Sequence, residues 1–490
     1  MNNVVALVLL YNLVVIGGIG FYLRWMERHS HSTIDMALGG RSSGVAMMSV
    51  TLAITYLGSA HVYGLMEMSF ILGAVALWFS FAHTILMCVI CLGTGPWIRR
   101  MGVSTIPELL GMLFGQRIRL ICACVASMVV FGLVTLETQT LGIGISAMSD
   151  WPLGWSAVLG AMIGTAYVYF GGIKQTMWVN LVNAVVMYAS IFIAAIYLTF
   201  ALPGGWDAVT DYYVSNGTEF KLSVFGEPTL LASFSLAAIF SVVFSQSVNQ
   251  QGMQACMSAE NEKVIRKSLW IAAPVNGLFG VFPVLCGLAA ATIPEFAELG
   301  PKLAGATLVV KLLPTWLVVL VQAGFIGALL STFAMSALAP ATIFAKDIIG
   351  SSKDEPLTPE REKSIIQSAI VIIGVIAGFM TFFLQPNVVF AITWLFAWLV
   401  PFFFIIVAGL FWKRSARAAF NVIMCCWVVN MVWSFAPQVK GALGLGFLEN
   451  PHVVSLVALL SVIFFNVIAK DAKEPLFAKG TSGTLTEAAS

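Results

Sequence analysis

The chain has 490 residues, of which 59% are hydrophobic and 10% are charged, with a formal net charge of +2; its mean hydropathy is +0.93. Soluble globular proteins average about 25% charged residues, so this composition excludes that class and indicates an all-α polytopic membrane protein. The small net charge points to no particular partner. We expect a lipid bilayer around the chain, no nucleic acid and no obligate protein partner.

Apolar stretches long enough for a transmembrane helix, which needs roughly 20 residues, recur along the chain. The first follows Met1-Asn2-Asn3 without a basic segment or a cleavage site, so we expect a retained helix rather than a signal peptide. The N-terminus is then expected outside the cell. We predict thirteen spans, near residues 4–23, 45–70, 71–96, 118–147, 152–170, 176–202, 229–255, 269–293, 314–345, 364–384, 387–412, 415–437 and 451–469.

The basic residues support this orientation. With the N-terminus outside, 21 of the 25 Lys and Arg residues fall in the cytoplasm, as the positive-inside rule requires. The exceptions are Lys221, Lys302, Lys311 and Lys440. We therefore expect a protein of the plasma (cytoplasmic) membrane whose C-terminus is cytoplasmic.

The predicted spans leave little room for other domains. We expect a single transmembrane domain over residues 1–469 and a polar cytoplasmic tail over 470–490. No internal sequence repeat is visible, although transporters often carry inverted repeats in their topology alone. Cys88 and Cys91 form a CxxC pattern without a second pair or a histidine set, so we interpret them as small packing residues.

The second span contains a weak stretch of helix, Gly58-Ser59-Ala60, at its middle. Polar or irregular backbone at membrane depth survives only where it faces protein or a water-filled cavity. A break at this stretch would free the carbonyls of Ile54 and Leu57. Close helix packing by small residues is an equal alternative.

The ninth span carries two adjacent hydroxyls, Ser331 and Thr332. In a helix they stand three and four residues after Ala328, so both lie over the turn that carries its carbonyl. Converging oxygens of this kind suit a hard cation. Ser and Thr in apolar helices more often bond back to the carbonyl four residues earlier, and spacing alone favours that simpler interpretation.

A polar stripe follows one face of the seventh span, where Ser241, Ser245 and Asn249 are spaced at four-residue intervals. Such a stripe lines a cavity or pairs helices, and its length favours the cavity. Trp394, in the eleventh span, is a candidate for an aromatic wall of the same cavity.

Glu137 lies near the middle of the fourth span. A buried carboxylate must face a cation, a hydrogen-bond donor or a proton path. A structural hydrogen bond to a neighbouring helix and a role in solute or proton binding are both open. His61, His83 and Glu67 are weaker signals, which we assign to packing or rim positions.

Five motifs in chain order resemble the sodium/solute symporter family, whose members carry proline, pantothenate, sialic acid and sugars. The resemblance covers most of residues 1–440, and each motif alone is weak. The motifs are Leu38-Gly39-Gly40-Arg41-Ser42, Tyr169-Phe170-Gly171-Gly172-Ile173-Lys174 with Trp178, Asn249-Gln250 with Ala259, Ser331-Thr332 running into Lys346-Asp347-Ile348, and Gly409-Leu410-Phe411-Trp412-Lys413.

The resemblance implies a leucine-transporter-type fold, with two inverted five-helix repeats over about 45–202 and 229–412. One helix (4–23) precedes them and two (415–437 and 451–469) follow. It also implies a sodium site made by backbone carbonyls of a broken first core helix and by one carbonyl and two hydroxyls of the eighth. Carried to this chain, the sodium ligands are Ile54, Leu57, Ala328, Ser331 and Thr332.

Several positions depart from the family pattern. Asn180, Ala334 and Met335 stand where many members have the groups of a second sodium site, so we expect one sodium ion only. Ala255 replaces a common Arg, and Glu137 is unusual at its position. The solute of any one relative is therefore not transferred to this chain.

We thus expect a sodium-coupled symporter, not an enzyme, that takes up a small organic solute. Two alternatives stay open: proton coupling through Glu137, with the hydroxyl pair only packing, and a solute sensor built on a transporter fold. The expected solute pocket is lined by Ser59, Ala60, Glu137, Gln139, Ser245, Asn249 and Trp394.

Overall fold

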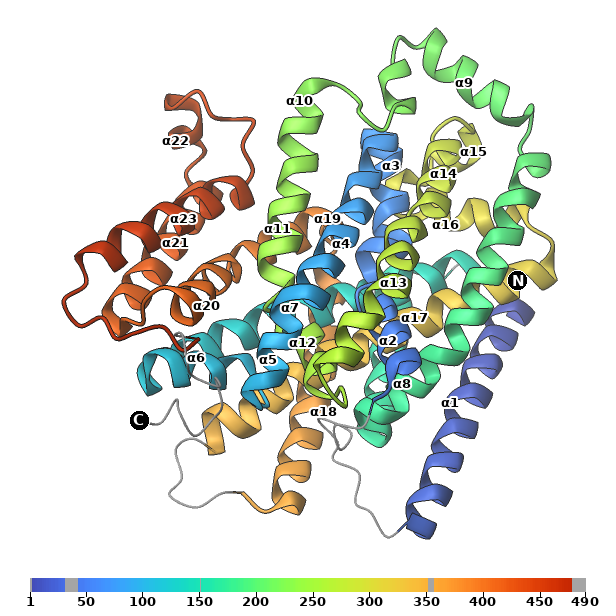
Figure 1. Cartoon of the computed structure of the whole chain (residues 1–490). Coiled ribbons are helices and arrows are strands. Elements are labelled where there is room, and N and C mark those ends of the chain that lie inside the picture. Colours follow the sequence, from blue (N-terminus) through green and yellow to red (C-terminus); the bar gives the residue numbers. More distant parts are fainter. Residues whose placement is uncertain (1, 31–42, 150, 351–356, 478–490) are drawn as a thin grey trace.

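The computed structural model describes residues 2–30, 43–149, 151–350 and 357–477. Over these ranges the chain forms a helical membrane protein (Figure 1). Twelve helices are long and apolar enough to cross a membrane, and the bent pair Val45–Thr55 and Ala60–Leu72 raises the number to 13. The prediction of thirteen spans is therefore confirmed. The motif at 38–42 and most of the predicted tail lie outside the described residues.

The first half of the chain builds the helices that surround the break in the second span. The long helix α8 holds two membrane-length segments, Leu153–Phe170 and Gln175–Ala201, so the two spans predicted there are joined in one helix. The elements are α1 (Asn2–Ser30), α2 (Val45–Thr55), η2 (Ala60–Gly64), α3 (Leu65–Leu72), η3 (Ala74–Ala76), α4 (Leu77–Val89), η4 (Ile90–Thr94), α5 (Gly95–Met101), α6 (Ile106–Phe114), α7 (Gln116–Ser149) and α8 (Leu153–Ala201).

The second half begins with short helices outside the predicted spans. The elements are α9 (Gly205–Ser215), η5 (Glu219–Leu222), α10 (Pro228–Leu230), η6 (Leu231–Ser235), α11 (Leu236–Gln246), α12 (Gln250–Met257), α13 (Glu262–Phe279), α14 (Val281–Ala290), α15 (Pro294–Ala297), α16 (Gly300–Leu312), α17 (Thr315–Ile343), η7 (Phe344–Ile349), α18 (Pro359–Phe383), α19 (Val388–Ala397), α20 (Val400–Phe411), α21 (Ala416–Phe435), α22 (Pro437–Ala442) and α23 (Asn450–Ile468).

The seventh predicted span, 229–255, is wrong as a continuous helix. The helix stops at Gln246 and resumes at Gln250. The Asn249 side chain accepts a hydrogen bond from the Gln251 N–H and so caps the new helix. The polar stripe therefore marks a second interruption rather than one face of a regular helix.

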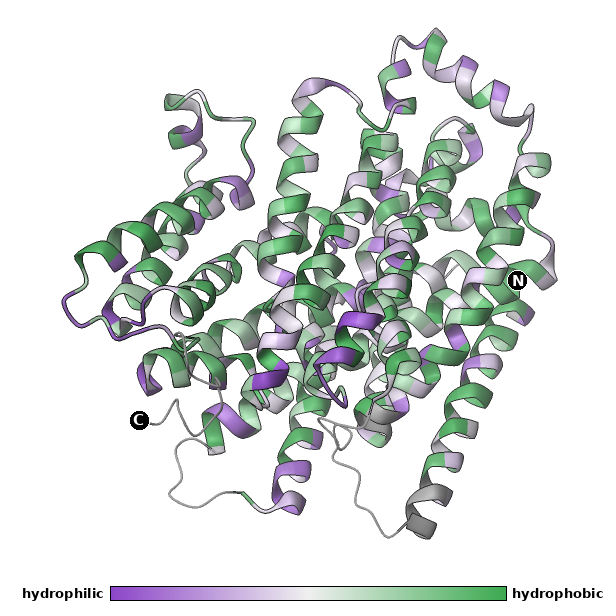
Figure 2. Ribbon diagram, viewed as in Figure 1, coloured by the Kyte–Doolittle hydropathy of each residue, from purple (hydrophilic) through white to green (hydrophobic). Residues whose placement is uncertain are grey.

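Burial separates the central helices from the peripheral ones. In the most apolar part of the Thr315–Ile349 span 89% of residues are buried, against 17% in the Asn3–Leu23 span. Figure 1 shows α1 at one edge of the bundle and α21 and α23 at the other. Apolar residues dominate the helices, whereas polar residues gather at helix ends and connections (Figure 2). The hydroxyl-bearing helix α17 is thus the buried centre of the molecule.

Candidate functional site

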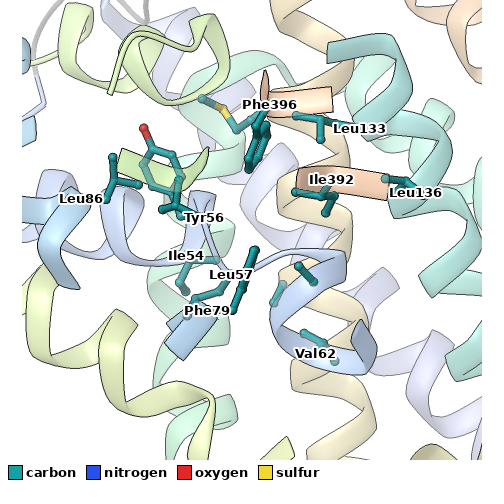
Figure 3. Packing of buried hydrophobic residues seen from close by; sticks show 14 of the residues in the cluster. Ile54, Tyr56, Leu57, Val62, Phe79, Leu86, Leu133, Leu136, Ile392 and Phe396 are labelled. Carbon is teal, nitrogen blue, oxygen red and sulfur yellow. The ribbon is translucent and has the colours of Figure 1, made fainter. Parts of the chain in front are cut away.

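The second span is broken near the middle of its length, and its two halves are bent by 54°. The Ile54 carbonyl accepts a hydrogen bond from the Leu57 N–H at 2.9 Å as α2 ends, and the Gly58 carbonyl accepts from the His61 N–H at 3.0 Å as the next turn begins. Figure 3 shows Ile54 and Leu57 at this break, beside Phe79. The predicted break is present, but the Ile54 carbonyl is not left free by it, because it accepts from the Leu57 N–H.

Gly58 lies where no side chain fits. A Cβ at this position would lie 2.3 Å from Glu137 Oε1 and 2.6 Å from Thr332 Cγ2, both closer than real Cβ atoms approach. The break in the second span, α7 and α17 therefore meet at one point. Only glycine permits this approach.

The Glu137 carboxylate binds the first residue of the second half of the broken helix. It accepts hydrogen bonds from the Ser59 N–H at 3.1 Å and 3.0 Å, one to each oxygen, and from the Ser59 hydroxyl at 2.9 Å. A negative group is stabilised at a helix N-terminus, where unpaired N–H groups carry partial positive charge. Glu137 thus caps a helix that belongs to another span.

The two adjacent hydroxyls of α17, those of Ser331 and Thr332, differ in their hydrogen bonding. The Thr332 hydroxyl donates to the Ala328 carbonyl at 3.0 Å, which is the simpler alternative considered for this motif. Ser331 is fully buried, and its hydroxyl has no hydrogen-bond partner among the described residues. One of the two hydroxyls therefore remains available to a ligand.

A small cavity of about 30 Å³ lies at the break, which is room for about two water molecules. Ser59, Ala60 and Glu137 line it, as does Thr332, so the structure brings these candidates together. The full lining is Thr55, Tyr56, Gly58, Ser59, Ala60, His61, Phe79, His83, Leu133, Glu137, Gln246, Gln251, Thr332, Ile392 and Phe396.

Two histidines line this cavity, although the sequence pattern assigned them to packing or rim positions. The rings of His61 and His83 lie 4.3 Å apart, centroid to centroid, in an edge-to-face arrangement. His83 Nδ1 is 2.8 Å from the Phe79 carbonyl, whereas His61 Nε2 has no partner among the described residues. Their position depends on contacts between spans, and nothing in the local sequence signals it.

Three other candidate solute residues do not line the cavity. The Gln139 amide donates to the Pro386 carbonyl at 2.9 Å, and the Ser245 hydroxyl bonds back to the Ser241 carbonyl. Asn249 donates from Nδ2 to Gln246 Oε1 at 2.9 Å, so it supports a residue of the cavity wall indirectly.

Trp394 lies at a different pocket. That pocket has a volume of about 330 Å³ and also includes Phe234, Phe390 and Glu449. The Trp394 indole donates to the Ser434 hydroxyl at 2.8 Å. The eleventh-span residues that line the central cavity are instead Ile392 and Phe396, which lie on either side of Trp394 along α19 (Figure 3).

An ion pair joins the second half of the broken helix to α16. Glu67, 3% exposed, lies 3.3 Å from the Lys302 ammonium. It also accepts from the Val388 N–H at 3.2 Å, and Lys302 donates to the Pro386 carbonyl at 2.7 Å. We call Glu67, Lys302, Pro386 and Val388 the outer cluster, because it ties three separate segments together.

A second ion pair lies just beyond the C-terminal end of α17. Arg119, at the start of α7, donates to Asp347 at 2.7 Å, and the Asp347 side chain is fully buried. Arg119 also reaches the Lys346 carbonyl at 3.4 Å. This inner pair ties the ends of α7 and η7 together.

Comparison with known proteins finds sodium-coupled transporters among the similar proteins. Over 292 residues the chain is 21% identical to sodium-coupled monocarboxylate transporter 1 of Homo sapiens, and over 300 residues it is 22% identical to the protein of that name from Xenopus laevis. These matches cover 56% and 58% of this chain and 46% of each relative. The chain thus spans about half the length of the curated relatives it matches.

Two solved structures share the fold. A Na⁺-coupled sialic acid symporter in a substrate-bound outward-open state gives a TM-score of 0.80 at 15% identity, covering 96% of this chain and 98% of that chain. A nucleobase-cation-symport-1 family transporter in a closed conformation with bound bromovinylhydantoin gives 0.56 at 15% identity, covering 89% and 94%. The predicted leucine-transporter-type fold is confirmed. The model of the Sodium:solute symporter family matches residues 37–424, and the chain belongs to that family of transporters.

Proposed function

We propose that this protein is a symporter that takes up a small organic solute with one sodium ion per cycle. Membership of the sodium:solute symporter family supports this proposal, as do relatives whose names specify sodium coupling. The monocarboxylates and sialic acid in those names are the solutes of those proteins. At 15% to 22% identity they do not specify the solute of this chain.

The proposed sodium ligands are the carbonyls of Ile54, Leu57 and Ala328 and the hydroxyls of Ser331 and Thr332. The observation that carries the proposal is the buried Ser331 hydroxyl without a partner, in the turn of α17 that contacts the break. A buried hydroxyl without a partner is costly, and an ion would supply the missing interaction. The Thr332 hydroxyl keeps its lone pairs while donating its proton, so its bond to Ala328 is compatible with ion binding.

Sodium in this position would couple the broken helix to α17. By fixing the two halves of the second span against α17, the ion would favour one arrangement of the core and shape the cavity for solute. One charge crossing about 100 mV contributes roughly 2.3 kcal/mol, and a tenfold sodium gradient roughly 1.4 kcal/mol. Their sum, about 3.7 kcal/mol, permits several-hundredfold accumulation of a neutral solute.

Sodium binding to the purified protein tests the proposal without knowledge of the solute. We expect sodium, but not potassium, to raise the melting temperature of the wild type, because an ion that binds only the folded state stabilises it. Ser331→Ala combined with Thr332→Ala should abolish this shift. Thr342→Ala is the matched control, since Thr342 is a buried α17 hydroxyl bonded to the carbonyl four residues earlier. An unchanged sodium shift in the double variant contradicts the proposed site.

Proton coupling through Glu137 is the second candidate, favoured by the burial of this carboxylate beside the broken helix. It makes the opposite prediction. Solute accumulation in vesicles would follow a pH gradient in sodium-free buffer, and Glu137→Gln would abolish it. Accumulation that needs sodium and ignores the pH gradient rejects this candidate.

We also propose that the protein lies in the plasma membrane with its N-terminus outside and its C-terminus in the cytoplasm, as a single transmembrane domain over residues 1–469. The distribution of basic residues supports this orientation. Lys311→Cys and Lys470→Cys, each as the single cysteine in a background without reactive cysteines, would test it. An impermeant thiol reagent added to intact cells should label the first and spare the second.

A further inference from the structure

We infer that the central cavity selects a solute by its N–H groups, as in an amine or an amide, and excludes the corresponding carboxylate. This inference rests on the proposed function, because it names the chemical class of solute for the same cavity. It follows from which hydrogen-bonding groups of the wall are already used and which are free.

The place where a solute carboxylate would bind is already occupied by the protein. In transporters of this fold the N-terminal end of a half-helix attracts anionic solute groups. Here the Ala60–Leu72 half begins beside Glu137, whose two oxygens accept from the Ser59 N–H and hydroxyl at 2.9 to 3.1 Å. A second carboxylate would meet a site whose backbone N–H and hydroxyl donors are already taken.

The histidine pair adds acceptors rather than donors. The Phe79 carbonyl can only accept, so its 2.8 Å contact with His83 Nδ1 places a proton on that nitrogen. His61 Nε2 is fully buried and has no partner among the described residues. In a neutral ring with the proton on the other nitrogen, Nε2 presents a lone pair.

Most hydroxyl groups of the cavity wall already donate hydrogen bonds to other groups of the protein. The Tyr56 hydroxyl donates to the Gln246 carbonyl at 3.3 Å and the Thr332 hydroxyl to the Ala328 carbonyl at 3.0 Å. Ser59 donates to Glu137. The buried Thr55 hydroxyl has no partner among the described residues and can either donate or accept a hydrogen bond. Besides the amide groups of Gln246 and Gln251, the wall offers carboxylate and imidazole acceptors, which an N–H donor satisfies and a carboxylate does not.

Matched compounds test this selection in the wild type. We would measure the shift in melting temperature, in sodium buffer, with alkyl amines, amides and carboxylates that share carbon skeletons from propyl to hexyl. We expect amines or amides to stabilise the protein and the matching carboxylates to leave it unchanged. Comparing the shifts with amines and with amides shows which of the two compound classes binds in the cavity. Stabilisation by carboxylates equal to that by their N–H counterparts overturns the inference.

Two variants locate the effect. Glu137→Gln keeps an acceptor for Ser59 but turns an amide N–H toward the cavity, so binding of the N–H compounds should weaken ~10-fold or more. Glu137→Ala frees the Ser59 N–H, and carboxylates should now stabilise the protein. Thr138→Ala is the control, because Thr138 is the buried neighbour on α7 whose hydroxyl bonds to the Val134 carbonyl. Unaltered N–H binding in Glu137→Gln overturns the inference.

The sodium shift measured without any compound separates this result from the proposed function. If wild-type sodium stabilisation is present and carboxylates bind, the inference fails while the symporter proposal stands. If sodium stabilisation is absent, the symporter proposal fails whatever the compounds do.

Discussion

At the scale of single residues, the site depends on one glycine and one carboxylate. Gly58 lets α7 and α17 approach the break, and Glu137 supplies three hydrogen-bond acceptor contacts to Ser59. Ser59 is the N-cap residue of the Ala60–Leu72 half of the broken helix, and its own side chain makes no capping hydrogen bond. Glu137, 78 positions away in sequence, therefore does the work of an N-cap residue.

Substitution of Gly58 tests this arrangement. Gly58→Ala should cost about 1 to 3 kcal/mol of stability, as overpacking does, and should abolish uptake because the break must widen. Gly17→Ala is the control: nothing lies within 4 Å of a Cβ there, and Ala in place of a helical Gly stabilises by about 0.5 to 1 kcal/mol. Thermal unfolding in detergent and vesicle uptake provide the measurements. Wild-type stability and uptake in Gly58→Ala would contradict the steric argument.

At the scale of elements, the outer cluster holds α3, α16 and the start of α19 together. Glu67 is nearly buried and faces Lys302, while its second oxygen accepts from the Val388 N–H. Lys302 and Gln139 both donate to Pro386. A motion that opens the cavity past this cluster must break these contacts together.

Loss of the Lys302 charge should loosen this cluster. In Lys302→Met we expect amide hydrogen exchange at Val388 to rise by about tenfold or more, because a buried carboxylate loses its ionic partner. Lys311→Met is the matched control on α16, since its ion pair with Glu295 is 44% and 61% exposed and such pairs contribute about 0 to 1 kcal/mol. Equal exchange at Val388 in both variants would show that the ion pair does not hold the segment.

At the scale of the whole molecule, α7 and α17 connect the inner pair to the central cavity. Arg119 and Glu137 lie on α7, and Thr332 precedes Asp347 along α17 and η7. The two helices pack against each other and against α8. A change at the inner pair therefore has a direct mechanical route to the proposed sodium ligands.

The inner pair should contribute to stability asymmetrically. Arg119→Ala removes the guanidinium that faces a fully buried carboxylate and should cost about 3 kcal/mol or more. Asp347→Ala should cost less, because the Arg119 side chain is 21% exposed and can reach water. The double variant should be more stable than Arg119→Ala alone. Thermal unfolding of the three variants gives the cycle, and additive losses would contradict the coupling.

Local sequence pattern predicted the membrane spans but only part of the candidate site. Span number followed from apolar length. The weak stretch Gly58-Ser59-Ala60 left a break and close helix packing equally open, and the resemblance to the family favoured the break. The interruption at Asn249 was missed, because a polar stripe at helical spacing resembles a helical face until the cap is seen. Trp394 was placed in the cavity by residue type, whereas the packing of α19 presents Phe396 there.

The sequence by itself determined that this is a membrane protein with a weak helical stretch early in the chain and a hydroxyl pair late in it, and its motifs resembled those of the sodium:solute symporter family. The membrane class depends on composition, and the hydroxyl pair on spacing within a single helix, whereas the broken helix was implied by the resemblance. The tertiary structure alone decided that Glu137 binds Ser59, that His61 faces His83, and that the Ser331 hydroxyl has no hydrogen-bond partner among the described residues. These depend on which helices pack together, and side chains separated by tens to hundreds of positions meet only after that packing is set.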